Sequence, residues 1–213
     1  MSTCTKEQFL KDIRNHVMKV IKDDGIHRHL LFKKPNGSEY WFEIVTWPGR
    51  LCIAGDMGDH VFARLSDMFE FFRTDRTEQE PLRINLGYWS EKLQATAKDG
   101  GFRKFSKEKF EANVRRRVEE YFDEEESAEV KEAVLQEIED DVLPEADEGA
   151  HAAYTAAMGY SHEGSRFSMH DFYESNCDEY TYHFEWCCYA IAWGIRQYDE
   201  AKNLAAIRMV SNG

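Results

Sequence analysis

The residues whose types and spacing could do chemistry are Asp56, Asp59 and His60, in the run Gly-Asp-Met-Gly-Asp-His that follows an expected strand. Carboxylates and imidazoles can hold two divalent metal ions, and such a metal pair clamps the attacking and leaving oxygens when a phosphate ester is hydrolysed. His27 and His29, two apart on another expected strand, point to one face and could add imidazoles. These residues define one hypothesis, a metal-dependent phosphohydrolase acting on nucleotides.

The rest of the sequence does not complete such a site. A two-metal cluster needs further Asp and His ligands on other loops. No Asp-x-His precedes the run and no Gly-Asn-His follows it, and a Gly/Asp turn that leaves a strand explains the same residues without chemistry. Phosphate-binding loops, dinucleotide fingerprints, nucleophile elbows and zinc-protease motifs are also absent from the sequence. We therefore expect no catalytic residue set, no bound metal and no cofactor.

The five cysteines point to a reducing compartment. Their number is odd, they form no C-x-x-C pair, and Cys187 and Cys188 are adjacent within an apolar run. This usage is typical of buried, reduced thiols rather than of a disulfide framework. The N-terminal residues lack the apolar run of a secretory signal, and the longest apolar stretch elsewhere is too short to cross a bilayer. We expect a cytoplasmic protein with no membrane contact.

The hydrophobic patterns of the sequence predict one α+β domain over 1–213, with a three-stranded antiparallel meander near the N-terminus that would position Asp56, Asp59 and His60. Residues 6–22 have helical apolar periodicity after a capping box at Thr5. Residues 27–54 then form three aromatic and β-branched runs, joined at Asn36-Gly37 and at Pro48-Gly49. The run 40–47 is bulky on both faces, so we expect both sides of the meander to be covered.

Helices dominate the rest of the chain. Apolar residues recur at four-residue steps after Ser106 and again after Ser127, and the second stripe reaches Pro144. Residues 149–180 begin with a short alanine-rich helix candidate, HAAYTAAM, and are then rich in turn formers and aromatics, so we expect mostly irregular structure there. From Thr181 the chain is apolar nearly all round if it is helical, which predicts a buried C-terminal helix packed within the domain.

The net charge is concentrated in one segment. Residues 119–148 hold 15 Asp and Glu against one Lys, a net −14, whereas the whole chain carries −13. We expect this segment to be an ordered, acidic, protruding subdomain, and Arg115, Arg116 and Arg117 before it to pair with acidic neighbours in this chain or in a second subunit. The carboxylates that we expect to contact a partner are Glu119, Glu120, Asp123, Glu124, Glu125, Glu126, Glu129, Glu132, Glu139 and Asp140.

Two explanations fit this acidic segment. A solvated helical face needs no partner. Alternatively, carboxylates on rigid helices can present charge at spacings comparable with the phosphates of a duplex, and so compete for a basic, nucleic-acid-binding protein. A calcium site is disfavoured because the EF-hand spacing is absent.

The aromatic runs WFEIVTWPGRLCIAGDMGDHVFARLSDMFEFFR and YHFEWCCYAIAWGIRQYD resemble small proteins encoded by bacteriophages and prophages, over about half the chain. The resemblance implies an accessory protein that binds and disables a host system, since some phage inhibitors of restriction and CRISPR defences are acidic DNA mimics. Here the ends are near neutral, so mimicry would be partial and confined to one face. The expected partner is a nucleic-acid-binding host protein, with no direct nucleic-acid contact, and a homodimer is the further expectation.

Overall fold

The computed structural model describes residues 3–97, 101–122 and 128–211. The chain forms two compact units. The sheet unit comprises residues 1–102 and 180–213, and the helical unit comprises residues 103–179. The acidic segment 119–148 therefore lies inside the helical unit, which is an insertion between two parts of the sheet unit.

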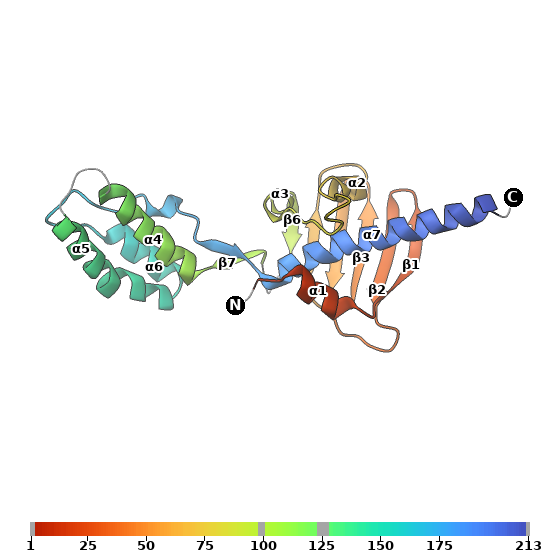
Figure 1. Ribbon diagram of the computed structural model, residues 1–213, viewed down its shortest axis with the longest axis horizontal. Helices are drawn as coiled ribbons and strands as arrows, with labels where there is room; N and C mark the ends of the chain where they lie inside the picture. The colour runs from red at the N-terminus through yellow and green to blue at the C-terminus, as the bar shows by residue number, and fades with distance from the viewer. Residues whose placement is uncertain (1–2, 98–100, 123–127, 212–213) are drawn as a thin grey trace. The chain divides into compact units, whose positions relative to one another are not determined.

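The sheet unit contains a six-stranded antiparallel meander whose strand order follows the sequence (Figure 1). Its strands are β1 (Val17–Asp24), β2 (His27–Lys33), β3 (Phe42–Trp47), β4 (Arg50–Gly55), β5 (His60–Phe62) and β6 (Leu93–Thr96). The α+β class and the meander over 27–54 are confirmed. The described part of the chain adds β1 on one side of that meander, and β5 and β6 on the other.

The N-terminal helix is shorter than the sequence predicts. Helix α1 (Lys6–Ile13) begins where the Thr5 hydroxyl accepts a hydrogen bond from the Gln8 N–H at 3.1 Å. The remainder of the predicted helix is strand β1, because its β-branched residues pair with β2. Gly25, with φ 61°, turns the chain between β1 and β2 and does not end a helix.

The two turns of the predicted meander differ. Pro48 and Gly49 form a two-residue connection between the paired residues Trp47 and Arg50, and Gly49 has φ 76°. Strands β2 and β3 also pair, but residues 34–41 join them, and within this loop the positive φ belongs to Tyr40 rather than to Gly37. The prediction of a tight two-residue turn at Asn36-Gly37 is therefore wrong, although the predicted pairing of the two strands is confirmed.

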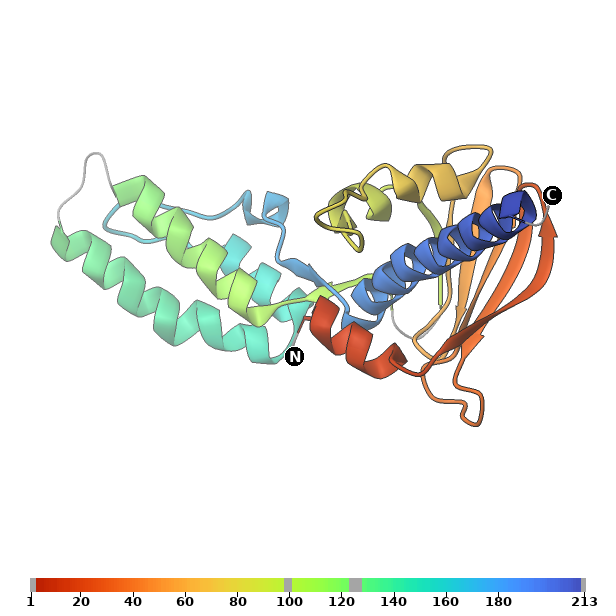
Figure 2. The ribbon, with the colours of Figure 1, turned by 45° about the vertical axis from the view of Figure 1, so that its right-hand side comes forward.

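The long helix α7 (Tyr182–Ser211) lies across one face of the sheet, as the sequence predicts for a buried C-terminal helix (Figure 2). Helix and sheet approach closely at Gly194, where an added Cβ would lie 2.7 Å from Cδ1 of Ile44. Helix α1 packs on the same side, with the Phe9 ring 5.2 Å from that of Trp186. Helices α2 (Met68–Arg73) and α3 (Leu86–Ser90) complete this layer, since Phe72 contacts both Phe62 and Trp89.

All four helices of the sheet unit thus cover one side of the sheet, which we call the core face. Leu30, Ile44 and Ile53 point to it and are fully buried. The other side, the open face, carries Val45 of β3 and Cys52 of β4, which are half-buried. We expected both sides of the meander to be covered. The described elements of this unit cover one side, the core face.

The helical unit begins and ends in the short paired strands β7 (Arg103–Phe105) and β8 (Asp178–Tyr180). Between them come α4 (Lys107–Phe122), α5 (Ala128–Glu137), the π-helical turn η1 (Ile138–Val142), the 3-10 turn η2 (Leu143–Asp147), α6 (Ala150–Gly159) and the 3-10 turn η3 (Phe172–Glu174). Val114, Val118, Val134 and Ile138 are fully buried, which confirms both predicted stripes. The expected cap Ser127 lies outside the described residues.

Candidate interaction surface

The two units differ completely in charge. The helical unit holds 22 Asp and Glu against nine Lys and Arg, a net −13, whereas the sheet unit holds 18 of each and is neutral. The whole net charge of the chain therefore belongs to the inserted unit. The helical unit includes the basic residues that precede the segment 119–148, and with them counted the sheet unit is left with no net charge.

The structure places the predicted contact residues on three successive elements. Glu119 and Glu120 lie in the last turn of α4, Glu129 and Glu132 lie on α5, and Glu139 and Asp140 lie on η1. All six are exposed. The other four predicted residues, Asp123, Glu124, Glu125 and Glu126, lie outside the described residues.

Part of this charge is already neutralised within the unit. Glu119 pairs with Lys131, Glu120 pairs with Arg116 at 2.9 Å, and Glu139 lies 3.7 Å from Arg115. Arg117 reaches Asp171 at 3.2 Å. The run of three arginines therefore pairs with acidic neighbours of its own chain, as the sequence predicts.

The unpaired carboxylates form a line along the outer side of α5. Glu129 and Glu132 are one turn apart, opposite the buried stripe, and neither has an ion-pair partner among the described residues. Asp140 continues the line two turns on and accepts a hydrogen bond from Gln136 at 3.0 Å. The predicted contact set leaves out four further exposed carboxylates nearby, Asp141, Glu145, Asp147 and Glu148. They lie on or directly after the π-helical turn η1 and the 3-10 turn η2, where the α-helical repeat of about 3.6 residues no longer applies.

The local backbone beside this line is held by a hydrogen-bonded cluster. The Glu137 carboxylate accepts hydrogen bonds from the Tyr160 hydroxyl at 2.7 Å and from His162 Nδ1 at 3.0 Å. The hydrogen bond from His162, and then that from Tyr160, lower the pKa of Glu137. Burial and the same carboxylate raise the pKa of Tyr160. Single π-helical turns occur often at functional sites, and here one carries three consecutive exposed carboxylates, Glu139 to Asp141.

A hollow of about 320 Å³ lies between α4 and the turns η1 and η2. Its lining combines Lys107, Glu111 and Arg115 of α4 with Glu139, Leu143 and Asp147 of the two turns. Lys107 pairs with Asp147 across it. Exposed pairs of this kind contribute little to stability.

The run Gly55 to His60 does not assemble a metal centre. Asp56 and Asp59 are exposed, whereas His60 is 2% exposed and lies on the core face opposite Ile53. His27 and His29 lie on the open face. The sheet therefore separates the histidines that the phosphohydrolase hypothesis combines, and the described residues hold no cluster of three or more His, Cys, Asp or Glu suited to a metal.

His60 has a structural environment. Its Nδ1 atom is 3.0 Å from the Thr96 hydroxyl, and its ring packs edge-on against Phe184 at 5.3 Å. Nε2 is buried without a hydrogen-bond partner among the described residues. Burial lowers the pKa of His60 to about 4, so the imidazole is neutral at pH 7.

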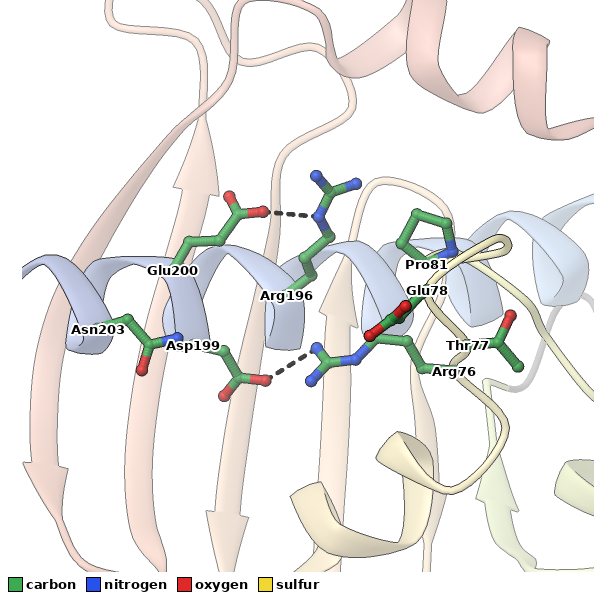
Figure 3. Close-up of a pocket in the computed structure, with 8 residues that line it drawn as sticks. All are labelled: Arg76, Thr77, Glu78, Pro81, Arg196, Asp199, Glu200 and Asn203. Carbon is green, nitrogen blue, oxygen red and sulfur yellow. Dashed lines mark hydrogen bonds and ion pairs between the residues drawn. The ribbon is translucent and has the colours of Figure 1, made fainter.

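The sheet unit has a polar groove of about 360 Å³ between α7 and residues 76–81 (Figure 3). Arg76 pairs with Asp199 at 2.9 Å and Arg196 pairs with Glu200 at 2.7 Å. Arg73 binds the same Asp199 at 2.6 Å. The two pairs with Asp199 join α2 and the loop after it to α7, whereas the pair between Arg196 and Glu200 lies within α7. The pairs with Asp199 span more than 120 residues of sequence, so no local pattern could have predicted them.

Comparison with models of protein families, with curated proteins and with solved structures finds no match to this chain. None of the described helices combines the length and the apolar character needed to cross a membrane.

Proposed function

We propose that this protein is a phage accessory protein that binds and inhibits a host nucleic-acid-directed defence system of the restriction or CRISPR type. The acidic helices of the inserted unit are the contact surface, and a basic, nucleic-acid-binding host protein is the partner. Binding is stoichiometric, and the carboxylates act as a partial mimic of a nucleic-acid backbone. Metal-dependent phosphohydrolysis gains no support from the positions of His27, His29 and His60.

The observation that carries the proposal is the partition of charge between the units. An ordinary solvated protein spreads its charges over its surface, whereas here one unit holds the entire net −13 and the other is neutral. Lys107 and the three arginines of α4 form ion pairs within the helical unit, and Lys109 donates to the Asp178 carbonyl at 2.6 Å. The excess carboxylate therefore faces solvent on ordered helices, where it can replace phosphates at a basic surface without a large ordering cost.

The test compares two double charge reversals of equal size. Glu129→Lys with Glu132→Lys changes the unpaired line on α5, and Glu163→Lys with Glu174→Lys changes two exposed carboxylates elsewhere on the same unit. Each protein is used to capture partners from a bacterial lysate, and captured proteins are challenged with duplex DNA. We expect the α5 variant to lose at least about tenfold in capture, and DNA to release the partner from the wild type.

The control variant should capture the partner as the wild type does, because its total charge change is the same. Equal loss in both variants would show that only net charge matters. Unchanged capture by the α5 variant at moderate salt, or capture that duplex DNA does not compete, would rule the proposal out.

A further inference from the structure

The open face of the sheet carries a row of residues with an apolar middle, and no described helix of the sheet unit packs on it. The register of the strands aligns one residue from each strand across this face. From β1 to β6 the row is Lys22, His29, Val45, Cys52, Val61 and Ala95. The helices of the unit all pack on the core face. The middle of the row, Val45, Cys52 and Val61, is half-buried.

The charged residues on either side of this row are complementary to one another. On β1, Lys19 lies on one side of the row and Asp24 on the other, and both point to the open face because their β2 partners are Leu31 and His27. Both are exposed, and neither has an ion-pair partner among the described residues. In the centre of the sheet, Glu43 lies on the Lys19 side and Arg50 on the Asp24 side.

A twofold axis along the row would bring these opposite charges together. Such an axis lays the sheets face to face and exchanges the two sides, so that Lys19 lies over Asp24 of the second copy. It also brings Glu43, which pairs with His29 of its own chain at 2.7 Å, near Arg50 of the second copy. His29, Val45, Cys52 and Val61 each meet their own equivalents. Lys22 meets itself, but it lies on the edge strand, where its exposed side chain can turn to solvent.

We propose that a second copy of this chain covers the open face, forming a twofold dimer in which the two sheets pack face to face. Six strands spaced about 4.8 Å apart, with about 17 Å along each strand, give a flat patch of roughly 400 Å² per copy. Two such patches are at the small end of specific protein interfaces, even with the relief of the side chains added. We therefore expect a reversible dimer that dissociates in the micromolar range.

Light scattering over the micromolar range tests the dimer, whose mass should approach twice 25.0 kDa as concentration rises. Val45→Lys in the centre of the row should weaken self-association at least about tenfold, because it buries a charge against an apolar neighbour. Val20→Lys is the matched control, since Val20 is an equally apolar, 45% exposed residue that pairs with Leu30 and so points to the other side of the sheet. It should leave the mass unchanged.

The charge pair tests the orientation of the two copies. Lys19→Glu and Asp24→Lys should each weaken the dimer, and the double variant should restore it, because the exchanged charges meet again across the axis. Both positions are exposed, so these variants stay informative if Val45→Lys fails to fold. Cys52 is the one cysteine of the five that is not buried. A short thiol cross-linker should therefore link two wild-type chains and fail with Cys52→Ser.

A single-chain mass throughout the concentration range would overturn the proposal. So would a dimer that Val45→Lys does not weaken, or one that gives no cross-link through Cys52. A protein that stays monomeric and binds single-stranded nucleic acid or another protein through Val45 would also overturn it.

Discussion

The sheet unit and the helical unit solve the problem of stability in different ways. The sheet unit is neutral and buries a large aromatic core, in which Phe32 stacks on Phe42 at 4.6 Å and meets Trp193 at 5.5 Å. The helical unit carries a net −13 and a smaller core of Phe, Val and Ala residues, surrounded by ion pairs. A strongly acidic surface repels itself, so the charge of the helical unit works against the stability of that unit.

The largest expected effect comes from removing a buried phenylalanine from each unit in turn, which tests whether the two units unfold independently. Phe32→Ala and Phe110→Ala remove the same fully buried side chain from the sheet unit and the helical unit respectively. Each should lower the free energy of unfolding of its own unit by about 3–5 kcal/mol. All five tryptophans lie in the sheet unit, so tryptophan fluorescence during urea unfolding reports on that unit alone.

We expect Phe32→Ala to lower the fluorescence midpoint and Phe110→Ala to leave it in place, while far-ultraviolet circular dichroism detects both. If the two substitutions shift the fluorescence midpoint equally, the units unfold as one and the comparison between them fails.

Acid should weaken the sheet unit through His60. Its pKa is about 4 in the folded protein and near 6.5 when unfolded, so the unfolded chain takes up the proton first. The contribution is fully present above about pH 6.5 and is lost as pH falls towards 4, by up to about 3 kcal/mol. Urea midpoints followed by tryptophan fluorescence at several pH values measure this. The fall between pH 6.5 and 4 should be clearly shallower in His60→Leu, and an identical fall would show that other groups cause it.

The smallest effect should come from the surface of the helical unit. Glu120→Gln breaks an exposed pair with Arg116, in which both side chains are more than half exposed. The free energy of unfolding should change by less than about 0.5 kcal/mol, because water and salt screen such pairs. Circular dichroism during urea unfolding is the measurement. A loss above about 1 kcal/mol would show that the ion pairs of this unit are structural, which would weaken the functional reading of its charge.

Sequence patterns with a short repeat predicted the structure well. The four-residue steps from Val114 to Phe122 and from Val134 to Val142 are buried stripes, and the apolar run from Thr181 is the buried part of α7. The acidic residues on those helices were therefore placed correctly on an exposed surface. The position of the remaining predicted carboxylates, Asp123 to Glu126, lies outside the described residues.

Features decided by distant parts of the chain could not be predicted. Val17, Val20 and Ile21 fit a helical stripe and a strand equally well, and pairing with β2 decides between them. The separation of His29 from His60 depends on the register of four strands, which no local pattern contains. Asp199 forms ion pairs with Arg73 and Arg76, which come more than 120 residues earlier in the sequence. Only the folded chain brings these residues together.

The ends of the helical unit meet, and this has an evolutionary consequence. The Ser106 N–H donates to the Cys177 carbonyl at 2.9 Å inside that unit, and the Thr181 N–H donates to the Phe102 carbonyl at 3.1 Å inside the sheet unit. Each unit therefore closes on itself at the point where the chain crosses between them. A gene with this arrangement can exchange its acidic cassette, or lose it to a short turn between Phe102 and Thr181, while the sheet that carries it keeps every strand in place. The sheet unit and the surface of the helical unit can therefore change independently of one another.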